Sequence, residues 1–440
     1  MSALPFPQLE GTCRFTRLRY LLRRRLEYGL NEAAELDDPE LPRYIRITDI
    51  TANGEIRSDT FKSVPEDVAR GNLLEGGDIL FARSGATVGK TVLFRREWGR
   101  ATFAGYLIRA DANRSELLPE FLIYWTASTW YWHWLMSSAT QATIQNVAAD
   151  RYADLPVPVW PIEVERAIAD YLDRETAKID TLIAKQERLI ELLQEKRQAL
   201  ISYAVTKGLN PDAAMKASGA EWFGDVPEHW KVKPVRLFAH VGNGSTPDRD
   251  NPAYWEDGNY PWLNSSVVNQ EAVTEAQQFV TPLALRECHL PKIVPPAVLI
   301  GITGQGRTRG MASTLLIEAT INQHVAYLKP HPHEADVGFL RRVFDMAYPY
   351  LRMESDGGGS TKGAITCEQI AHLKIPIPPL TEQVAIATHL DSVTANIDGL
   401  AAKVTSAIAL LREYRSALIS AAVTGQLDLR QHEAQLEALA

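Results

Sequence analysis

The stretch Ala167–Thr206 reads AIADYLDRETAKIDTLIAKQERLIELLQEKRQALISYAVT, and it returns as Ala385–Thr424, AIATHLDSVTANIDGLAAKVTSAIALLREYRSALISAAVT. The likeness runs from Leu155 to Thr206 and from Leu373 to Thr424 at a constant shift without a gap (391 − 173 = 218). A repeat of this length exceeds the period of a solenoid and indicates a duplicated domain together with its connecting helix. Two similar modules joined by a stiff spacer are typical of a protein that reads two sites at once.

Apolar residues recur in both copies at alternating spacings of three and four, which is the pattern of a coiled coil. The pattern predicts a seam made of Ile179, Leu182, Leu189, Leu193 and Leu200 in the first copy and Ile397, Leu400, Val404, Leu411 and Leu418 in the second, with polar interruptions at Gln186 and Lys196. The stripe is too long for one small domain to cover. We therefore expect the two helices to pair with each other, antiparallel, and to hold the modules at opposite ends. The alternative is that each helix folds back on its own module.

The remaining sequence alternates short apolar runs with Gly, Pro and Asp, as strands and turns do. The clearest strands are Ile79–Phe81 and Val298–Ile300, and prolines precede both long helices. The fold class predicted is α+β, with two mixed α/β modules separated by two long α-helices. The expected division is a first module at 1–154, a spacer helix at 155–207, a connector at 208–228, a second module at 229–372, a second spacer helix at 373–426 and a tail at 427–440.

Composition places few constraints on function beyond solubility. The chain has 440 residues and a formal charge of −8, from 46 Lys and Arg against 54 Asp and Glu. This balance argues mildly against nucleic acid as a partner, but arginines crowd the segment from Arg14 to Arg25, so the average is compatible with a local basic patch. The three cysteines share no ligand spacing, and neither a signal peptide nor a run of ~20 apolar residues is present. We expect a cytoplasmic protein with no membrane partner and no metal site.

One glycine-rich segment approaches a nucleotide-binding motif. Ser84–Thr91, SGATVGKT, is one residue short of a P-loop, and a strand-like segment follows it where a P-loop requires a helix. We interpret it, and the matching segment Gly304–Gly310, as hairpin tips whose basic and hydroxyl side chains approach phosphates. A plain solvated turn is the alternative. Asn251–Tyr254 similarly falls short of the methyltransferase motif Asn-Pro-Pro-Tyr, and we interpret it as a proline turn.

No group of His, Cys or carboxylate residues has catalytic spacing, so the sequence nominates no catalytic residue. Polar side chains near the turns and strand ends are of types that contact phosphates and base edges. The candidate DNA-binding residues are Arg46, Thr48, Arg83, Ser84, Thr87, Lys90, Gln141, Asn264, Ser265, Gln305, Arg307, Thr308, Arg309, Gln323, His324, Thr361 and Lys362.

Several phrases together resemble one family. They are Gly77–Gly85 (GDILFARSG), the proline strands Leu155–Pro158 and Ile375–Pro379, and the phrases Ser218–Trp222 (SGAEW) and Val226–Trp230 (VPEHW). In this order, and with the duplicated helices, they resemble the specificity subunit of type I restriction–modification systems. The resemblance covers nearly the whole chain. It is weakest at the start, where no Ser-Gly-…-Trp phrase precedes Arg14.

The resemblance implies that each module is a target-recognition domain that reads one half of a split, asymmetric site in double-stranded DNA. It implies that the helices act as the spacer and dock two modification subunits, which bind S-adenosylmethionine and methylate adenine, while restriction subunits add ATP- and Mg-dependent translocation and cleavage. The chain itself is then non-enzymatic and holds no cofactor. A coiled-coil adaptor that touches no DNA is the alternative, and a self-sufficient methyltransferase is the third choice.

Overall fold

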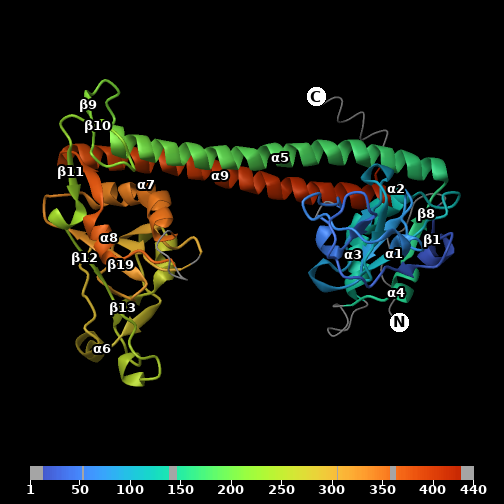
Figure 1. Ribbon diagram of the computed structural model, residues 1–440, viewed down its shortest axis with the longest axis horizontal. Helices are drawn as coiled ribbons and strands as arrows, with labels where there is room; N and C mark the ends of the chain where they lie inside the picture. The colour runs from blue at the N-terminus through green and yellow to red at the C-terminus, as the bar shows by residue number, and fades with distance from the viewer. Residues whose placement is uncertain (1–12, 52–53, 138–145, 305, 357–362, 428–440) are drawn as a thin grey trace. The chain divides into compact units, whose positions relative to one another are not determined.

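The computed structural model describes residues 13–51, 54–137, 146–304, 306–356 and 363–427. The chain divides into two compact units, Met1–Glu187 with Thr405–Ala440 as unit 1 and Arg188–Val404 as unit 2. Each unit contains one segment of each long helix, α5 Ile162–Lys207 and α9 Leu380–Val423 (Figure 1). We call the remainder of unit 1 module 1 and the remainder of unit 2 module 2.

Module 1 is built around a four-stranded sheet of order β2-β7-β4-β5. The central strand β4 reads ILFA and is buried on both faces, as a continuous apolar run allows. Ile79 and Phe81 pack with the helices, while Leu80 and Ala82 pack with a smaller cluster under β3 and β6. The elements are β1 Arg14–Arg17, β2 Glu27–Tyr28, β3 Arg43–Ile45, α1 Glu66–Ala69, β4 Ile79–Ala82, β5 Thr91–Leu93, β6 Ala101–Phe103, β7 Leu107–Ala110, α2 Pro119–Ala127, α3 Thr129–Ser137, α4 Ala149–Ala153 and β8 Pro156–Val159.

Module 2 has a five-stranded sheet of order β12-β19-β16-β17-β14 and a three-stranded sheet of order β15-β13-β18. Strand β16 alternates in the same way, since Val298 and Ile300 pack with α7 while Leu299 faces the other cluster. The elements are β9 Met215–Lys216, β10 Val226–Pro227, β11 Lys231–Pro234, β12 Ala239–Asn243, β13 Tyr260–Leu263, β14 Ala272–Val273, β15 Gln278–Val280, α6 Pro282–Glu287, β16 Ala297–Gly301, β17 Ala312–Leu315, β18 Thr320–Ile321, β19 Val325–Pro330, α7 Val337–Asp356, α8 Cys367–His372 and β20 Lys374–Ile377.

The duplication extends into the strand pairing of the modules. Tyr44 of β3 pairs with Thr102 of the parallel strand β6, and Trp262 of β13 pairs with Thr320 of β18 (44 + 218 = 262; 102 + 218 = 320). Strands β1 and β8 form an antiparallel pair, as do β11 and β20. Main-chain hydrogen bonds hold these pairs, so they persist although the side chains differ. The shift of 218 residues therefore identifies equivalent positions in β3 and β13 and in β6 and β18, whereas the partners of Val159 and Ile377, Arg14 and Lys231, differ by 217.

Both long helices begin later than their sequence pattern suggests. Residues 155–161 and 373–379 are not helical, because they contain strands β8 and β20. Proline favours an extended conformation in the residue before it, and Pro158 and Pro376 each have such a neighbour. In unit 1 the beginning of α5 packs with the end of α9, and in unit 2 the end of α5 packs with the beginning of α9. The helices are therefore antiparallel, as the predicted fold class requires, and their ends also pack on the modules.

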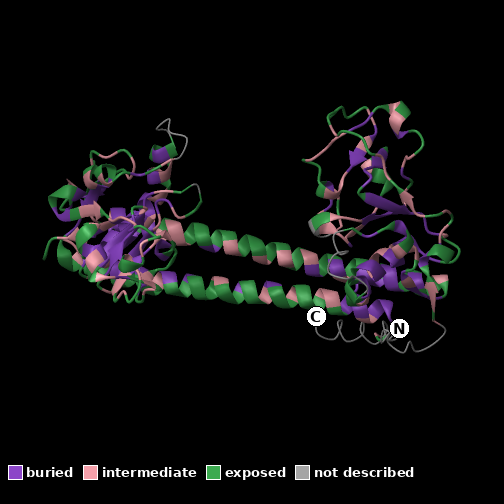
Figure 2. Ribbon diagram, turned by 90° about the horizontal axis from the view of Figure 1, so that it is seen from below, coloured by how far each residue is buried: buried purple, intermediate pink, exposed green. Residues whose placement is uncertain are grey.

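The seam between the helices contains different residues from those predicted at three positions. Leu182, Leu189 and Leu400 are exposed, so those three assignments are wrong. The inward-facing positions alternate with exposed ones along each helix (Figure 2). They are Ile179, Ile183, Gln186, Ile190, Leu193, Arg197, Leu200 and Ala204 in α5, and Ile397, Ala401, Val404, Ile408, Leu411, Arg415, Leu418 and Ala422 in α9. Arg197, and not Lys196, is thus the second polar interruption in α5.

An equivalent ion pair crosses the seam in each unit. In unit 1 the Asp180 carboxylate accepts from Arg415 Nε at 2.9 Å, and in unit 2 the Asp398 carboxylate accepts from Arg197 Nε at 3.1 Å. The shift of 218 converts one pair into the other (180 + 218 = 398; 197 + 218 = 415). The seam therefore has the approximate two-fold symmetry that a duplicated helix acquires when it pairs with itself antiparallel.

A second equivalent contact fastens each module to the first turn of its helix. Glu165 of α5 is fully buried and accepts from Leu118 N at 2.8 Å and Trp160 N at 3.3 Å. Its equivalent in α9, Gln383, accepts from Asp336 N at 2.8 Å and donates to Pro378 O at 2.9 Å. Burial raises the pKa of Glu165 to about 7, although its two backbone donors favour the ionised form.

We predict a pH-dependent stability of unit 1 that a single substitution removes. Because the pKa of Glu165 rises from 4.5 to about 7 on folding, the folded state binds more protons than the unfolded state between these values. Stability is therefore expected to fall as pH rises from 4.5 to 7, by on the order of 3 kcal/mol. Thermal unfolding of the full chain at pH 5 and pH 8 measures the difference, which Glu165→Gln should largely abolish.

The reverse change supplies the matched control. Gln383→Glu places a carboxylate beside Pro378 O and should introduce the same pH dependence into unit 2. The Gln side chain of Glu165→Gln has one acceptor oxygen, so it cannot accept from both Leu118 N and Trp160 N as the carboxylate does. The change in melting temperature between the two pH values is therefore diagnostic, and the absolute melting temperature is not. A Glu165→Gln chain that keeps the wild-type difference would contradict the prediction.

Candidate nucleic-acid interface

Module 1 gathers polar side chains along one edge of its sheets, which we call polar edge 1: Tyr28, Arg46, Arg83, Tyr106 and Asn146. The edge forms because strand ends meet there: Arg83 N donates to Tyr106 O at 3.0 Å, and Ala104 N donates to Ile45 O at 2.9 Å. Arg83 is held in place, since its Nε donates to Asn146 Oδ1 at 3.0 Å and its guanidinium lies 4.7 Å from the centre of the Tyr28 ring. A half-exposed guanidinium fixed in this way is preorganised for an anionic or hydrogen-bonding ligand.

Module 2 presents the equivalent edge with different chemistry, which we call polar edge 2: Thr246, Asn264, Thr303, Gln323 and His324. The same main-chain links recur, because Ile302 N donates to His324 O and Asn322 N donates to Leu263 O, both at 3.0 Å. The side chains form a chain of hydrogen bonds, with Thr246 Oγ1 and Gln323 Oε1 2.6 Å apart and Thr303 Oγ1 and His324 Nδ1 2.8 Å apart. Neutral donors and acceptors dominate here, whereas edge 1 carries two arginines.

Arg46 and Asn264 are equivalent residues in the two edges (46 + 218 = 264). Each caps a short 3-10 helix, Ile47–Asp49 or Ser265–Asn269, that directly follows the paired strand. Arg46 is largely occupied, because it donates to both carboxylate oxygens of Asp49 and to Thr60 O. Asn264 Oδ1 accepts from Ser266 N at 2.9 Å, so its amide nitrogen takes no part in the cap. Thr48 is exposed on the first of these short helices, and Ser265 is half-buried on the second.

The turn between β16 and β17 carries one exposed and one buried arginine. Arg352 NH1 donates to Gly306 O at 2.6 Å and Tyr348 OH donates to Arg307 O at 3.0 Å, so α7 supports the turn from beneath. The Arg307 side chain is exposed and Thr308 is half-buried. Arg309 is only 3% exposed and pairs with Asp356, so its prediction as a DNA contact is corrected to a structural role.

The corresponding turn of module 1 follows β4. Ser84 and Lys90 are half-exposed there, while the Thr87 hydroxyl is buried and makes no hydrogen bond to any described residue. Thr87 is therefore poorly placed to touch DNA. The strand expected after this turn is present as β5, which agrees with our interpretation of the turn as a hairpin tip. Four candidates, Gln141, Gln305, Thr361 and Lys362, lie outside the described residues.

Sequence reasoning missed several residues of these edges. Tyr106 is 61% exposed in the turn before β7, and it is the equivalent of the predicted His324 (106 + 218 = 324). Applying the helix repeat to the modules would have found it. Arg249, which follows Thr246 in the sequence and is not one of the residues that define edge 2, had no such signal. Its guanidinium lies 3.9 Å and 4.7 Å from the ring centres of Trp255 and Trp262, and it donates to Gln278 Oε1 at 3.1 Å.

Clusters of three or more His, Cys, Asp or Glu side chains arranged to hold a metal ion are absent from the described ranges. None of the helices in these ranges combines the length and hydropathy that crossing a bilayer requires.

Comparison with known proteins points to one family. Residues 227–408 match the family model described as "Type I restriction modification DNA specificity domain". Over these residues the chain resembles the DNA specificity domain of type I restriction–modification systems. It is 22% identical over 418 residues to the type I restriction enzyme EcoKI specificity subunit of Escherichia coli K12, covering 89% of this chain and 83% of that protein.

Two solved structures share the fold of this chain. One, from a study titled "Structural basis underlying complex assembly and conformational transition of the type I R-M system", has a TM-score of 0.74 at 19% identity and covers 96% of this chain and all of the other. The HsdS subunit of Thermoanaerobacter tengcongensis has a TM-score of 0.55 at 18% identity and covers 97% and 100% of the two chains. At these identities the likeness establishes the fold alone.

Proposed function

We propose that this chain is the non-catalytic DNA-reading subunit of a type I restriction–modification complex, and that each module reads one half of a bipartite, asymmetric target. The observation that carries the proposal is the pair of polar edges, which stand at equivalent places in the duplicated modules but differ in chemistry. Because the two edges stand at equivalent places in their modules, both are suited to contact the same duplex. Because their side chains differ, each is suited to a different half-site. Arg83 of edge 1 matches a guanine edge or a phosphate, whereas the amides and imidazole of edge 2 match other base edges.

We further propose that the long helices dock two modification subunits. Leu182 and Leu410 of unit 1 and Leu400 and Leu192 of unit 2 are exposed, with fractions between 41% and 65%, and lie outside the seam. The shift converts one pair into the other (182 + 218 = 400; 192 + 218 = 410). Exposed leucines at equivalent sites suit two copies of one apolar partner surface. In this arrangement S-adenosylmethionine and ATP with Mg are bound by partner subunits.

The salt dependence of DNA binding tests the proposal. Arg83→Ala and Arg307→Ala should each weaken binding to every duplex and reduce the slope of log K against log salt by about one, if each side chain neutralises a phosphate. Titration of the full chain with labelled duplex at several salt concentrations measures the slope. Arg188→Ala, which removes an exposed arginine from α5, is the matched control and should leave the slope unchanged.

The outcome also separates this proposal from the adaptor alternative. A chain without salt-dependent DNA binding, alone and with its modification subunits, would support a coiled-coil adaptor. Relaxed preference at one base pair, with an unchanged slope, would assign that arginine to base reading and not to phosphate contact.

A further inference from the structure

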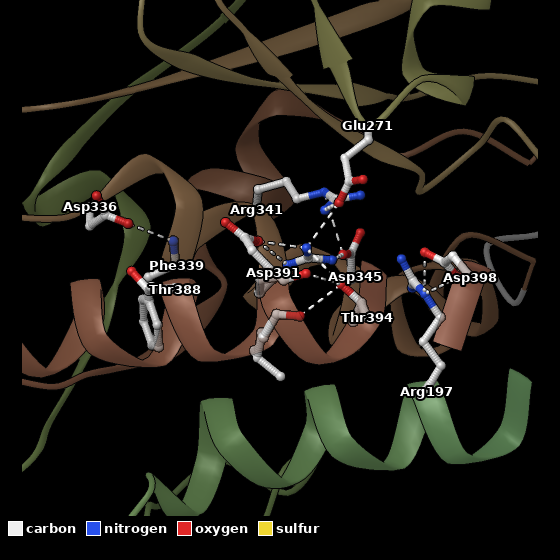
Figure 3. Close-up of polar contacts among 12 residues, drawn as sticks. Arg197, Glu271, Asp336, Phe339, Arg341, Asp345, Thr388, Asp391, Thr394 and Asp398 are labelled. Carbon is white, nitrogen blue, oxygen red and sulfur yellow. Dashed lines mark hydrogen bonds and ion pairs between the residues drawn. The ribbon is translucent and has the colours of Figure 1, made fainter. Parts of the chain in front are cut away.

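A buried arginine joins three parts of unit 2. Arg342 of α7 is 1% exposed, and its NH2 donates to Asp391 Oδ1 at 2.6 Å and Thr394 Oγ1 at 3.1 Å on α9. The same nitrogen donates to Glu271 Oε1 at 2.9 Å. Glu271 belongs to the segment that leads into β14. Figure 3 shows the surrounding side chains converging on this point from the module and from the helix: Glu271, Arg341, Asp345, Asp391 and Thr394.

Glu271 links this joint to polar edge 2. It lies two residues after the 3-10 helix Ser265–Asn269, which Asn264 caps, and its carbonyl accepts from Thr314 N at 3.1 Å. Its carboxylate also accepts from Arg341 NH1 at 2.6 Å. Burial raises the pKa of Glu271, but the two arginines outweigh that effect and hold it below its ordinary value. The guanidinium of Arg342 thus connects helix α9 to the segment beside the proposed base-reading residues.

Module 1 has an equivalent joint with a neutral donor. Tyr124 of α2 is the counterpart of Arg342 (124 + 218 = 342), and its hydroxyl is 2.5 Å from Asp173 Oδ1 and 3.3 Å from Thr176 Oγ1. Asp173 and Thr176 are the counterparts of Asp391 and Thr394. One hydroxyl can donate one hydrogen bond, whereas the planar fork of arginine donates several at fixed angles. The joint of module 2 is therefore held at more points.

We propose that Arg342 is a positioning residue that fixes the angle of the reading loops of module 2 on α9, and thereby sets the gap between half-sites that the protein accepts. The proposal rests on the proposed DNA-reading function. Arg342 touches no base in this scheme and acts through Glu271. Loosening the Arg342 contacts leaves the preferred bases unchanged but lets module 2 bind its half-site at other distances from the first half-site.

The test uses the full-length chain and a target obtained by selection from randomised duplexes with the wild type. Binding is then measured for that duplex and for versions with the gap one base pair shorter or longer. Wild type should disfavour the wrong gaps by about tenfold or more, the size of one mismatched pair. Arg342→Ala should reduce this ratio to about twofold while selecting the same bases, and Arg342→Lys should fall between, because an ammonium lacks the fork.

Two further variants keep the test decisive if Arg342→Ala folds poorly. Glu271→Gln changes a side chain that is 59% exposed and should relax the gap in the same direction. Tyr124→Phe removes only the neutral donor of module 1 and should relax it less than Arg342→Ala. A gap ratio equal to wild type, or an equal loss of affinity for all gaps, would overturn the positioning role. Failure of the wild type to select any duplex would instead overturn the DNA-reading function itself.

Discussion

Replacing Leu182 and Leu410 together by glutamate is expected to remove one modification subunit from the assembled complex. Both leucines are exposed and lie in unit 1 outside the seam, so the substitutions leave the helix pairing intact. Forcing a carboxylate into an apolar contact should cost roughly 3–5 kcal/mol, which is more than a hundredfold in affinity. Native mass spectrometry of the complex measures the loss directly as the mass of one subunit.

The equivalent pair provides the internal comparison. Leu400→Glu with Leu192→Glu should remove one subunit as well, and all four changes together should leave the specificity chain without modification subunits. Thr181→Glu with Ala409→Glu adds the same charges one residue away, on other faces of the helices, and should have no effect. Full occupancy in the quadruple variant would refute this docking surface while leaving the DNA-reading proposal untouched.

Exchange of module 1 is expected to change one half of the recognised site and to preserve the other. The exchange is best cut at residues 13–160, because strands β1 and β8 pair with each other and should be transferred together. The original duplex should lose roughly a thousandfold or more in specific affinity, since half of its base contacts disappear. Selection from randomised duplexes identifies the new target.

The reciprocal exchange of residues 231–377, from β11 to β20, should change the other half only. The two experiments together define which module reads which half-site. If either exchange altered both halves, or neither, the modules would not be independent readers.

Much of the architecture could be predicted from the sequence because it depends on strong, repeated signals. The duplicated helices and the buried strands β4 and β16 follow from hydrophobic periodicity and bounding turns. The strand register of the modules could not be seen, since main-chain hydrogen bonds leave no mark on side-chain identity. Only the fixed shift of 218 residues, carried over from the helices, relates Tyr106 to His324.

The seam shows why one flank was predicted incorrectly. Leu182 and Ile183 are adjacent and both apolar, as are Leu189 and Ile190, so two stripes one residue apart satisfy the heptad equally well. In α9 the larger side chains even lie on the exposed flank, with Leu400 outside and Ala401 inside. We attribute this to the second role proposed for the helices, because a surface kept for a partner subunit carries the apolar side chains that periodicity assigns to the interior.

Arg309 illustrates a limit of another kind. A basic residue in a glycine-rich turn is the expected phosphate contact, yet its guanidinium turns inward to Asp356 while Arg307, two residues earlier, points outward. The support that α7 gives to this turn decides the difference, and that support comes from residues more than forty positions along the chain.

The ion pairs of the seam are also expected to disfavour a parallel pairing of the two helices. If the two repeats paired in parallel instead of antiparallel, matching positions would meet, and the half-buried Arg197 would lie directly opposite the half-buried Arg415. Like charges at such a position oppose association, so the wrong alignment is penalised during synthesis as well as in the finished protein. A gene duplication that could have produced two competing orientations thus contains its own means of rejecting one.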